Sequence, residues 1–306
     1  MAVSEINVHK QVTGDSTLRD KDYDRLLKES ADWRSAAGGV YGRRAARKLR
    51  RLLIGFAVFF ALWYVATTLF SLPRFQFIPN PVYLFQQWIS LDPQYGVSLF
   101  TPVYYEHIAV STLRVYAAFF LSIALGAPLG ILIGWNKTAK NLIYPVIELL
   151  RPIPPLAWVP LAVLILYGTE LPVIFVTMLA AFFATVLNTY LGVRSIDETY
   201  LRAAACLGYS RWTVLWRVII PGALPYIFTG MEIAMGVAWF SLVGGELIAG
   251  RSGLGYMIFD AYQQVALPNI FIGMITLGVL GWGSSSLIRY IGSWLMAWQA
   301  KARREG

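Results

Sequence analysis

The residues best suited to specific chemistry lie in a short polar stretch between two long apolar ones. From Arg202 the chain reads Arg-Ala-Ala-Ala-Cys-Leu-Gly, and nine residues later it reads Val-Ile-Ile-Pro, ending at Pro221. The small side chains of Ala203 and Ala204 would let another protein approach the backbone closely, and arginines such as Arg211 carry charge that cannot lie in lipid. We therefore predict noncovalent chemistry here, in a loop that binds another protein.

Local signals predict two short helices in the loop 195–221. Ser195 and Glu198 have the spacing of a capping box, which favours a helix start, and Gly208 can supply the left-handed residue that ends the helix. A second helix is expected to begin at Ser210 and to finish before the proline that closes the loop. An ordinary loop between two spans is the alternative interpretation, and the complete spacing of small residues, glycine and proline argues against it.

A second candidate for chemistry is an arginine inside an apolar stretch. Residues 151–160 read Arg-Pro-Ile-Pro-Pro-Leu-Ala-Trp-Val-Pro, and no regular lipid-facing helix accommodates this run, because each interior proline removes a backbone hydrogen bond. Arg151 is expected near the middle of the membrane, where a charge marks either a substrate path or a structural ion pair. The carboxylates available for such a pair are those of Glu148, Glu232 and Glu246. We predict a substrate path whose candidate residues are Arg151, Pro152, Pro155, Trp158 and Glu246.

The composition defines the class of protein that must position these residues. Of 306 residues, 57% are hydrophobic and 14% charged, and the apolar residues form runs of about 20, which is long enough to cross a hydrocarbon core. The single cysteine, Cys206, excludes an internal disulfide, and His9 and His107 are too few and too far apart for a metal site. The Gly-rich stretch 244–255 lacks the Gly-Lys-Ser/Thr ending of a phosphate loop. The sequence therefore predicts an integral membrane protein without nucleotide or metal sites of its own.

Hydropathy and charge predict how the chain crosses the membrane. Six spans are expected, at residues 52–71, 108–135, 142–167, 171–193, 222–246 and 268–296. Lysines and arginines concentrate before the first span and after the second, fourth and sixth, which indicates that both termini and the loop 195–221 are cytoplasmic. The loop 72–106 would then lie outside; its prolines exclude a seventh continuous span, and a short amphipathic helix is expected at 82–89.

Two tails flank the predicted membrane domain 52–296. Residues 1–51 form a polar N-terminal tail whose basic end supplies much of the net charge of +9, and residues 297–306 form a short cytoplasmic C-terminal tail. Basic clusters can bind nucleic acid, but this cluster directly precedes a span, so that a role in topology and contact with anionic lipid is the better interpretation. We expect no nucleic-acid partner.

The polar stretch resembles the EAA motif of bacterial ABC-importer permeases, in which Glu-Ala-Ala, three further residues and Gly are followed, after nine more residues, by Ile-x-Leu-Pro. Ala203, Ala204, Gly208 and Pro221 match, whereas Arg202 stands where the family usually has Glu. Further similar segments are Ser111-Thr112-Leu113-Arg114, Leu150 to Pro160, Gly245-Glu246-Leu247 and Ser252-Gly253-Leu254-Gly255-Tyr256. From about residue 52 to 296 the chain is similar to membrane subunits of the nitrate/sulfonate/taurine/bicarbonate branch of binding-protein-dependent importers.

The resemblance implies an all-α membrane protein of the type I importer architecture in the bacterial inner membrane. Its partners would be a second permease copy in a homodimer, two ATP-binding subunits, and a periplasmic or lipid-anchored solute-binding protein. ATP and Mg²⁺ would bind to the ATPase, and this chain would bind no cofactor and catalyse no covalent step. The residues expected to couple it to the ATPase are Arg202, Ala203, Ala204, Gly208, Arg211 and Pro221.

The resemblance also implies a small oxoanion as substrate, with a sulfonate such as taurine expected first and nitrate second. Bicarbonate or a small aromatic or pyrimidine compound is the alternative substrate. A proton-coupled secondary transporter or a channel is the alternative class, and it would need intramembrane carboxylates such as Glu148, Glu232 and Glu246 as relays; no inverted repeat is apparent in the sequence.

Overall fold

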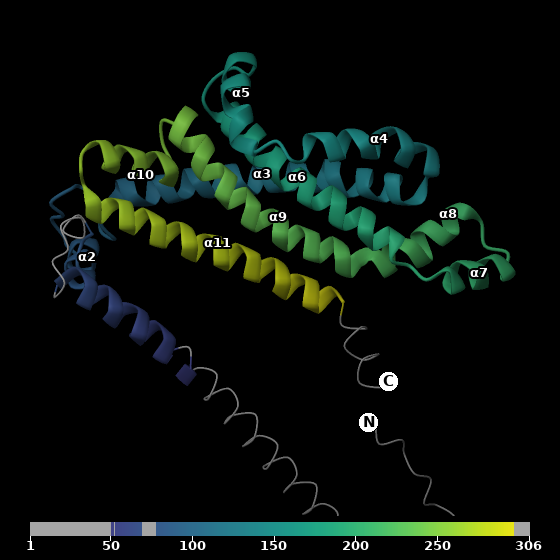
Figure 1. Cartoon of the computed structure of the whole chain (residues 1–306), viewed down its shortest axis with the longest axis horizontal. Helices are drawn as coiled ribbons and strands as arrows, with labels where there is room; N and C mark the ends of the chain where they lie inside the picture. Colours follow the sequence, from purple (N-terminus) through teal and green to yellow (C-terminus); the bar gives the residue numbers. More distant parts are fainter. Residues whose placement is uncertain (1–49, 52, 69–77, 297–306) are drawn as a thin grey trace, which may run out of the picture. The chain divides into compact units, whose positions relative to one another are not determined.

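The computed structural model describes residues 50–51, 53–68 and 78–296, and all regular secondary structure in these residues is helical (Figure 1). The chain divides into two units, which are considered separately. The first, ending at Pro81, contains the apolar helix Leu53–Thr68. The second begins at Val82 and contains the candidate sites. Both predicted tails lie outside the described residues, apart from Arg50 and Arg51.

The helices follow one another with short connections. They are α2 (Pro81–Trp88), α3 (Pro102–Trp135), α4 (Lys137–Leu150), α5 (Val159–Ile165), α6 (Glu170–Arg194), α7 (Glu198–Cys206), α8 (Arg211–Val214), α9 (Ile220–Ala249), α10 (Leu254–Gln263) and α11 (Leu267–Leu295). A 3₁₀ turn, Pro155–Trp158, precedes α5, and a π turn, Leu215–Ile219, precedes α9. The short helix expected at 82–89 is present as α2.

Among the described residues, four helices are long and apolar enough to cross a membrane. They are α3, α6, the continuous helical segment Arg211–Ala249, and α11. The predicted third span is different: residues 142–167 do not form one helix, because α4 and the segment Pro155–Ile165 meet at an angle of 91°. The continuous span is therefore corrected to a bent pair. The break contains Pro152 and Pro154 and is followed directly by Pro155, all three in the run that the sequence predicts to be incompatible with a regular helix. Because proline has no backbone N–H to donate, these residues cannot continue the hydrogen bonding of α4.

Close packing of α3 against α6 explains a four-residue repeat of glycines. Gly126, Gly130 and Gly134 face Thr185, Thr189 and Val193, respectively, on α6. A Cβ atom added at Gly130 would lie 2.6 Å from both the Cβ atom of Thr189 and the carbonyl oxygen of Val186. The two helices can approach this closely only because α3 presents no side chain there. Figure 1 shows α3, α6 and α9 running side by side, with α11 along α9.

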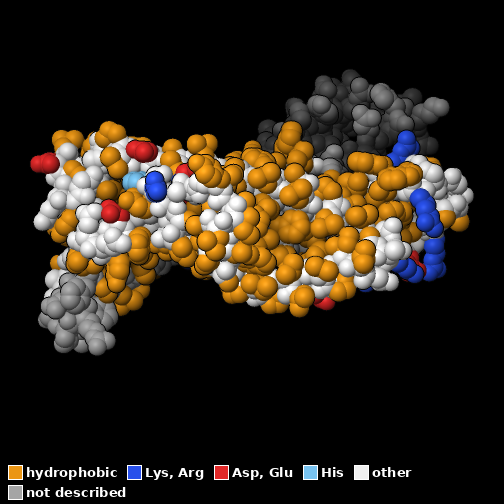
Figure 2. Space-filling model, turned by 90° about the horizontal axis from the view of Figure 1, so that it is seen from above, with side chains coloured by type: hydrophobic (Ala, Val, Ile, Leu, Met, Phe, Trp, Pro, Cys, Tyr) orange, Lys and Arg blue, Asp and Glu red, His pale blue; other side chains and the backbone are white. Residues whose placement is uncertain are grey.

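Charge is distributed unevenly over the second unit. Figure 2 shows lysine and arginine side chains gathered at the end where α7 and α8 lie, whereas carboxylates are prominent at the opposite end, around α10. The side of the molecule between these ends is covered largely by hydrophobic side chains. An apolar middle with lysine and arginine concentrated at one end is the pattern that the positive-inside rule describes for membrane-spanning proteins.

Candidate functional site: the loop between α6 and α9

Helix α7 begins after Asp197, and the predicted capping box is wrong by two residues. The Asp197 carboxylate accepts a hydrogen bond from the Thr199 N–H at 2.8 Å. Ser195 has helical dihedral angles of −80° and −6° and ends α6, where its hydroxyl donates to the Gly192 carbonyl. An N-cap needs an extended backbone, which Asp197 has with a ψ of 133°. The N–H of Thr199 also lowers the pKa of the Asp197 carboxyl below its ordinary value.

Gly208 ends α7 as predicted. Its φ of +72° lies in the left-handed region, and the N–H of Gly208 donates to the Ala205 carbonyl while that of Tyr209 donates to the Ala204 carbonyl. No atom lies within 4 Å of the position that a Cβ would take at Gly208. Glycine is therefore favoured here by backbone conformation alone and not by lack of space.

The second short helix begins as predicted but does not end before Pro221. Ser210 caps it, with its hydroxyl oxygen accepting from the Thr213 N–H at 3.2 Å. The helix then passes through the π turn, in which the N–H of Ile220 donates to the carbonyl of Leu215, and continues into α9. Pro221 lies in the first turn of α9, where its missing N–H is tolerated. The correction matters because α8 becomes continuous with a membrane helix.

The two predicted alanines differ in their surroundings. Ala203 is exposed, whereas Ala204 is only 4% exposed and packs inside an apolar cluster of this chain. The other buried members of that cluster are Val193, Val214, Leu215, Ile219, Ala223 and Ile227. Ala204 therefore holds α7 against α6, α8 and α9, and only Ala203 is open to another protein.

The outer surface of the loop carries aromatic and basic side chains. Tyr200, Leu207, Trp212 and Trp216 are each exposed by about two thirds or more, and Arg202, Arg211 and Arg217 are exposed as well. Arg202 forms an ion pair with Glu198, one turn earlier on α7, at 2.8 Å. Aromatic residues and arginine are the residue types enriched where proteins bind one another. We name these seven side chains the coupling surface.

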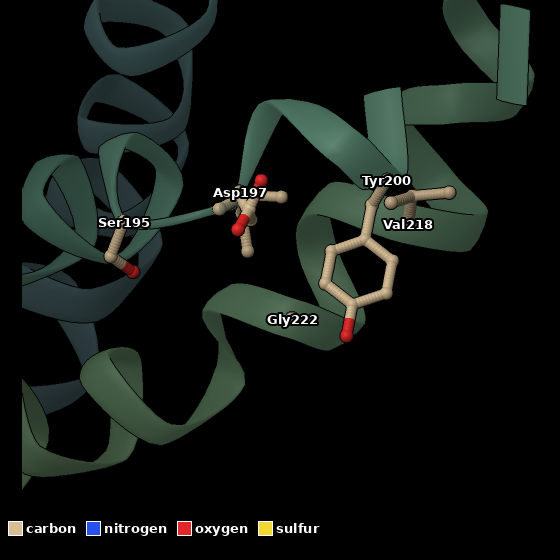
Figure 3. Close-up of a pocket in the computed structure, with 6 residues that line it drawn as sticks. Ser195, Asp197, Tyr200, Val218 and Gly222 are labelled. Atoms are coloured by element: carbon tan, nitrogen blue, oxygen red, sulfur yellow. The ribbon is translucent and has the colours of Figure 1, made fainter. Parts of the chain in front are cut away.

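A pocket of about 370 Å³ lies at the base of this loop (Figure 3). It is lined by Ser195, Ile196, Asp197, Tyr200, Val218 and Gly222. Figure 3 shows the Tyr200 ring extending from α7 toward the first turn of α9. A Cβ at Gly222 would lie 2.5 Å from the Ile196 Cδ1 atom, so that glycine allows Ile196 to pack against α9. The pocket thus lies between the start of α7 on one side and the π turn and first turn of α9 on the other.

A second polar site lies at the other end of the same helices and centres on Arg114. The guanidinium donates to both carboxylate oxygens of Glu170 at 2.6 Å, to Glu246 at 2.8 Å and to the Ser252 carbonyl at 2.7 Å. The Glu246 carboxylate also accepts from the Ser111 hydroxyl and from the Gly255 N–H. Arg114 is 2% exposed and Glu246 is fully buried. The network therefore joins α3, α6, α9 and the loop before α10.

This network engages one of the predicted path residues. Glu246 has no exposed surface in this chain, and both of its carboxylate oxygens are hydrogen-bonded. Two features favour glycine at position 253. Its φ of +111° is one that residues with a side chain rarely adopt, and a Cβ atom there would collide with the Glu246 carboxylate. A role of Glu246 in the substrate path remains a prediction, to which these contacts add a structural role.

The other path residues lie at the bend between α4 and α5. Arg151 and Pro152 are exposed, whereas Pro155 and Trp158 are half-buried. Arg151 forms no ion pair with any carboxylate in the described part of the chain; Glu246 pairs with Arg114, and Glu232 pairs with Arg289. The bend itself packs on α9, because a Cβ at Gly244 would overlap the side chain of Leu156. The structure thus leaves the charge of Arg151 uncompensated within the described residues.

Sequence reasoning did not assign a role to Arg114 or Asp197. Arg114 could have been found as a charged residue within a predicted span, because such residues require a partner. Asp197 could have been weighed against Ser195 as the helix cap, since both are good N-cap residues. The identity of their partners needs the three-dimensional arrangement.

Comparison with known proteins shows the family to which the chain belongs. The chain belongs to the family described as binding-protein-dependent transport system inner membrane component, which matches residues 126–304. Similar proteins include a probable ABC transporter permease of Brucella abortus strain 2308, 38% identical over 82% of this chain and 96% of its own. The taurine transport system permease protein TauC of Escherichia coli K12 is 35% identical over 78% of this chain and 87% of its own.

A nitrate relative and a solved structure extend the comparison. The nitrate import permease protein NrtB of Leptolyngbya laminosa is 32% identical over 70% of this chain and 77% of its own. The structure of the inward-facing MetNI methionine ABC transporter aligns with a TM-score of 0.52 over 63% of this chain and 94% of its own, at 18% identity, and shows the fold. The chain is thus an ABC-importer permease subunit of type I architecture, and not itself an enzyme.

Proposed function

We propose that the loop 195–221 receives the ATPase of an ATP-driven importer and transmits its movement to α9. The observation that carries this proposal is the continuity of α8, the π turn and α9. The coupling-surface residues from Arg211 to Arg217 belong to one helical segment, Arg211–Ala249, so a force on them acts directly on a membrane helix. Gly208 fixes the angle between α7 and this segment. ATP-driven closure of the ATPase pair would then rock the helices as rigid bodies between inward-facing and outward-facing states.

The expected partners follow from the same arrangement. ATP and Mg²⁺ would bind to two separate ATP-binding subunits at the basic, cytoplasmic end, and a solute-binding protein would deliver substrate at the acidic end. A second copy of the chain would cover the bend between α4 and α5. Irregular backbone at membrane depth must face protein or water, and the adjoining Leu164, Ile165 and Tyr167 are 84%, 71% and 95% exposed.

A substrate path between two such copies would place Arg151 where it can act on an anion. Its side chain is exposed at the end of α4 and has no ion-pair partner in the described residues. A fixed positive charge would stabilise a small anion that has lost part of its hydration shell. The substrate that this favours is a small oxoanion, with a sulfonate such as taurine or nitrate first. Bicarbonate and small aromatic or pyrimidine compounds are the alternatives.

Transport in proteoliposomes tests the proposed function. The complex of this chain with its ATPase and solute-binding protein is expected to accumulate one labelled oxoanion only when ATP is supplied, and a variant ATPase that binds ATP without hydrolysing it is the matched control. Taurine, nitrate and bicarbonate are offered separately to identify the substrate. Uptake that persists without the ATPase and collapses with the proton gradient would instead assign the chain to secondary transport.

A further inference from the structure

One exposed group of side chains at the acidic end is not accounted for by the loop or by the Arg114 network. It consists of Tyr105 and Glu106 at the start of α3, Phe259, Asp260 and Tyr262 on α10, and Val265 in the turn before α11. Asp260 is half-buried, and one of its carboxylate oxygens accepts a hydrogen bond from the Gln264 side chain at 2.7 Å; the other five side chains are exposed. We name this group the outer patch. Tyr105, Tyr262 and Val265 are 53%, 68% and 63% exposed, which is far more than apolar and aromatic side chains need for packing within the chain.

The start of α3 and helix α10 lie against each other. The His107 ring contacts the Tyr256 ring, with centroids 6.2 Å apart, and His107 Nδ1 accepts a hydrogen bond from the Gly253 N–H. Asp260 follows Tyr256 by one helical turn, and Glu106 is next to His107 in the chain. The two carboxylates therefore lie on the two helices that meet at the His107–Tyr256 contact.

The turn after α10 holds an apolar side chain outward on a strained backbone. Val265 has a φ of 57°, in the left-handed region that β-branched residues rarely adopt. Hydrogen bonds from Val265 and Ala266 N–H groups to the carbonyls of Tyr262 and Ala261 maintain this conformation. The Val265 side chain is nevertheless 63% exposed. Backbone strain of this kind is concentrated where proteins contact ligands or partners.

The charge around the outer patch has one predominant sign. The described segments at this end of the second unit, residues 82–106, 167–170 and 250–266, contain four carboxylates, those of Asp92, Glu106, Glu170 and Asp260, and one arginine, Arg251. Only Glu170 is committed to an ion pair within the described chain, with Arg114. A partner that presents carboxylates here would be repelled, and one that presents arginine or lysine would be attracted.

We propose that the outer patch docks the solute-binding protein of the importer through basic side chains on the rim of that protein, arginine foremost. This inference rests on the proposed function. A guanidinium can stack on the ring of Tyr262 or Phe259, whose rings already stack with centroids 6.5 Å apart, and can donate to the carboxylate of Asp260. Anionic lipid headgroups fit less well, because they would meet the carboxylates of Glu106 and Asp260.

The experiment measures binding kinetics by surface plasmon resonance. The complex of this chain with its ATPase, held in zwitterionic nanodiscs, is exposed to the purified solute-binding protein without added substrate at low and high KCl. In the double variant Glu106→Gln/Asp260→Asn, the association rate is expected to fall about tenfold at low salt and to lose most of its salt dependence. Tyr262→Ala is expected to raise the dissociation rate about tenfold. Asp92→Asn, which removes a carboxylate outside the outer patch, should change either rate less than about twofold.

The possible results separate the two proposals. Co-purification of the ATPase checks that each variant is assembled. If the wild-type complex binds the solute-binding protein and the patch variants bind it with unchanged rates and salt dependence, the outer patch is not the docking surface. Variants that alter binding only in nanodiscs with anionic lipid would assign the patch to the membrane and overturn the inference. If the wild-type complex binds no solute-binding protein and its ATPase activity is unaffected by it, the proposed importer function fails instead.

Discussion

Arg114 and Glu246 form an ion pair at 2.8 Å in the interior of the membrane domain, with 2% and 0% of their side chains exposed. The residues are on α3 and α9, and the same guanidinium binds Glu170 on α6. Removing one partner would leave a buried charge without compensation, which costs more than the pair itself contributes. The pair therefore fixes how three spans meet at the end opposite to the coupling surface.

The first prediction concerns this pair. Arg114→Gln should lower the free energy of unfolding by about 3 to 5 kcal/mol, because the Glu246 carboxylate stays buried and unpaired. The double variant Arg114→Gln/Glu246→Gln should recover much of that loss. Thermal unfolding of the purified chain measures both. A single variant that is as stable as the double variant would show that the pair does not organise the three spans.

The second prediction concerns the contact between α3 and α6. Gly130→Ala should destabilise the protein, since the added Cβ meets the Val186 carbonyl oxygen at 2.6 Å, and backbone cannot move aside cheaply. Gly278→Ala on α11 is the matched control, because nothing lies within 4 Å of its Cβ position. The control should be neutral or slightly stabilising as helix propensity improves. Equal melting temperatures for the two variants would contradict the packing account.

Local signals in the sequence predicted two of the three helix ends in the loop 195–221 that depend on a single residue, and misplaced the third. The left-handed Gly208 and the cap at Ser210 were predicted correctly, because each depends on residues within a few positions. Asp197 displaced Ser195 as the cap of α7 because α6 extends through Arg194 and leaves Ser195 with helical dihedral angles. That displacement depends on where the preceding helix ends, which the capping-box spacing does not contain.

Features that depend on distant residues were not predictable in this way. The prolines after Arg151 indicated irregular backbone, but the 91° bend comes from packing on α9 and α6. The continuity of α8 with α9 arises from a π turn that Pro221 alone does not reveal. Arg114 and Glu246 are separated by 132 positions in the chain, and the residues around either one do not predict the other as its ion-pair partner. The helix end at Gly208 and the helix start at Ser210 could thus be predicted from the sequence, whereas the contacts between distant residues required the structure.

The third prediction concerns Arg202, which replaces the Glu of related motifs. Arg202→Glu should weaken co-purification of the ATPase, and the loss should be larger at low salt than at high salt, because the affected charge is exposed. Glu198→Gln is the matched control: it removes the ion pair on α7 and leaves the charge of Arg202 free for a partner. Co-purification of Arg202→Glu that equals wild type at both salt concentrations would exclude Arg202 from the contact.

The fourth prediction separates the two roles considered for Arg151. Its exposure and its lack of an ion pair within the described residues lead us to expect that Arg151→Ala assembles normally but transports the anion poorly. Arg151→Lys should keep part of the uptake, since the charge remains while the guanidinium geometry is lost. Assembled complex, basal ATP hydrolysis and uptake are measured on the same preparations. Full uptake by Arg151→Ala would remove this residue from the path, and loss of the assembled complex would make it structural.

The central claim is that Gly208 sets the angle between α7 and the α8–α9 segment, and that this angle is needed to transmit the movement of the ATPase to the membrane helices. ATP-driven uptake by Gly208 variants tests this claim most directly. Gly208→Val should insert and fold but lose uptake, because a β-branched residue does not hold the left-handed conformation without strain. Gly208→Asn should retain much of the uptake, since asparagine tolerates that conformation. No atom lies within 4 Å of the Cβ position at residue 208, so lack of space for that atom does not explain a difference between the variants. Wild-type uptake by Gly208→Val, or failure of that variant to fold, would contradict the account.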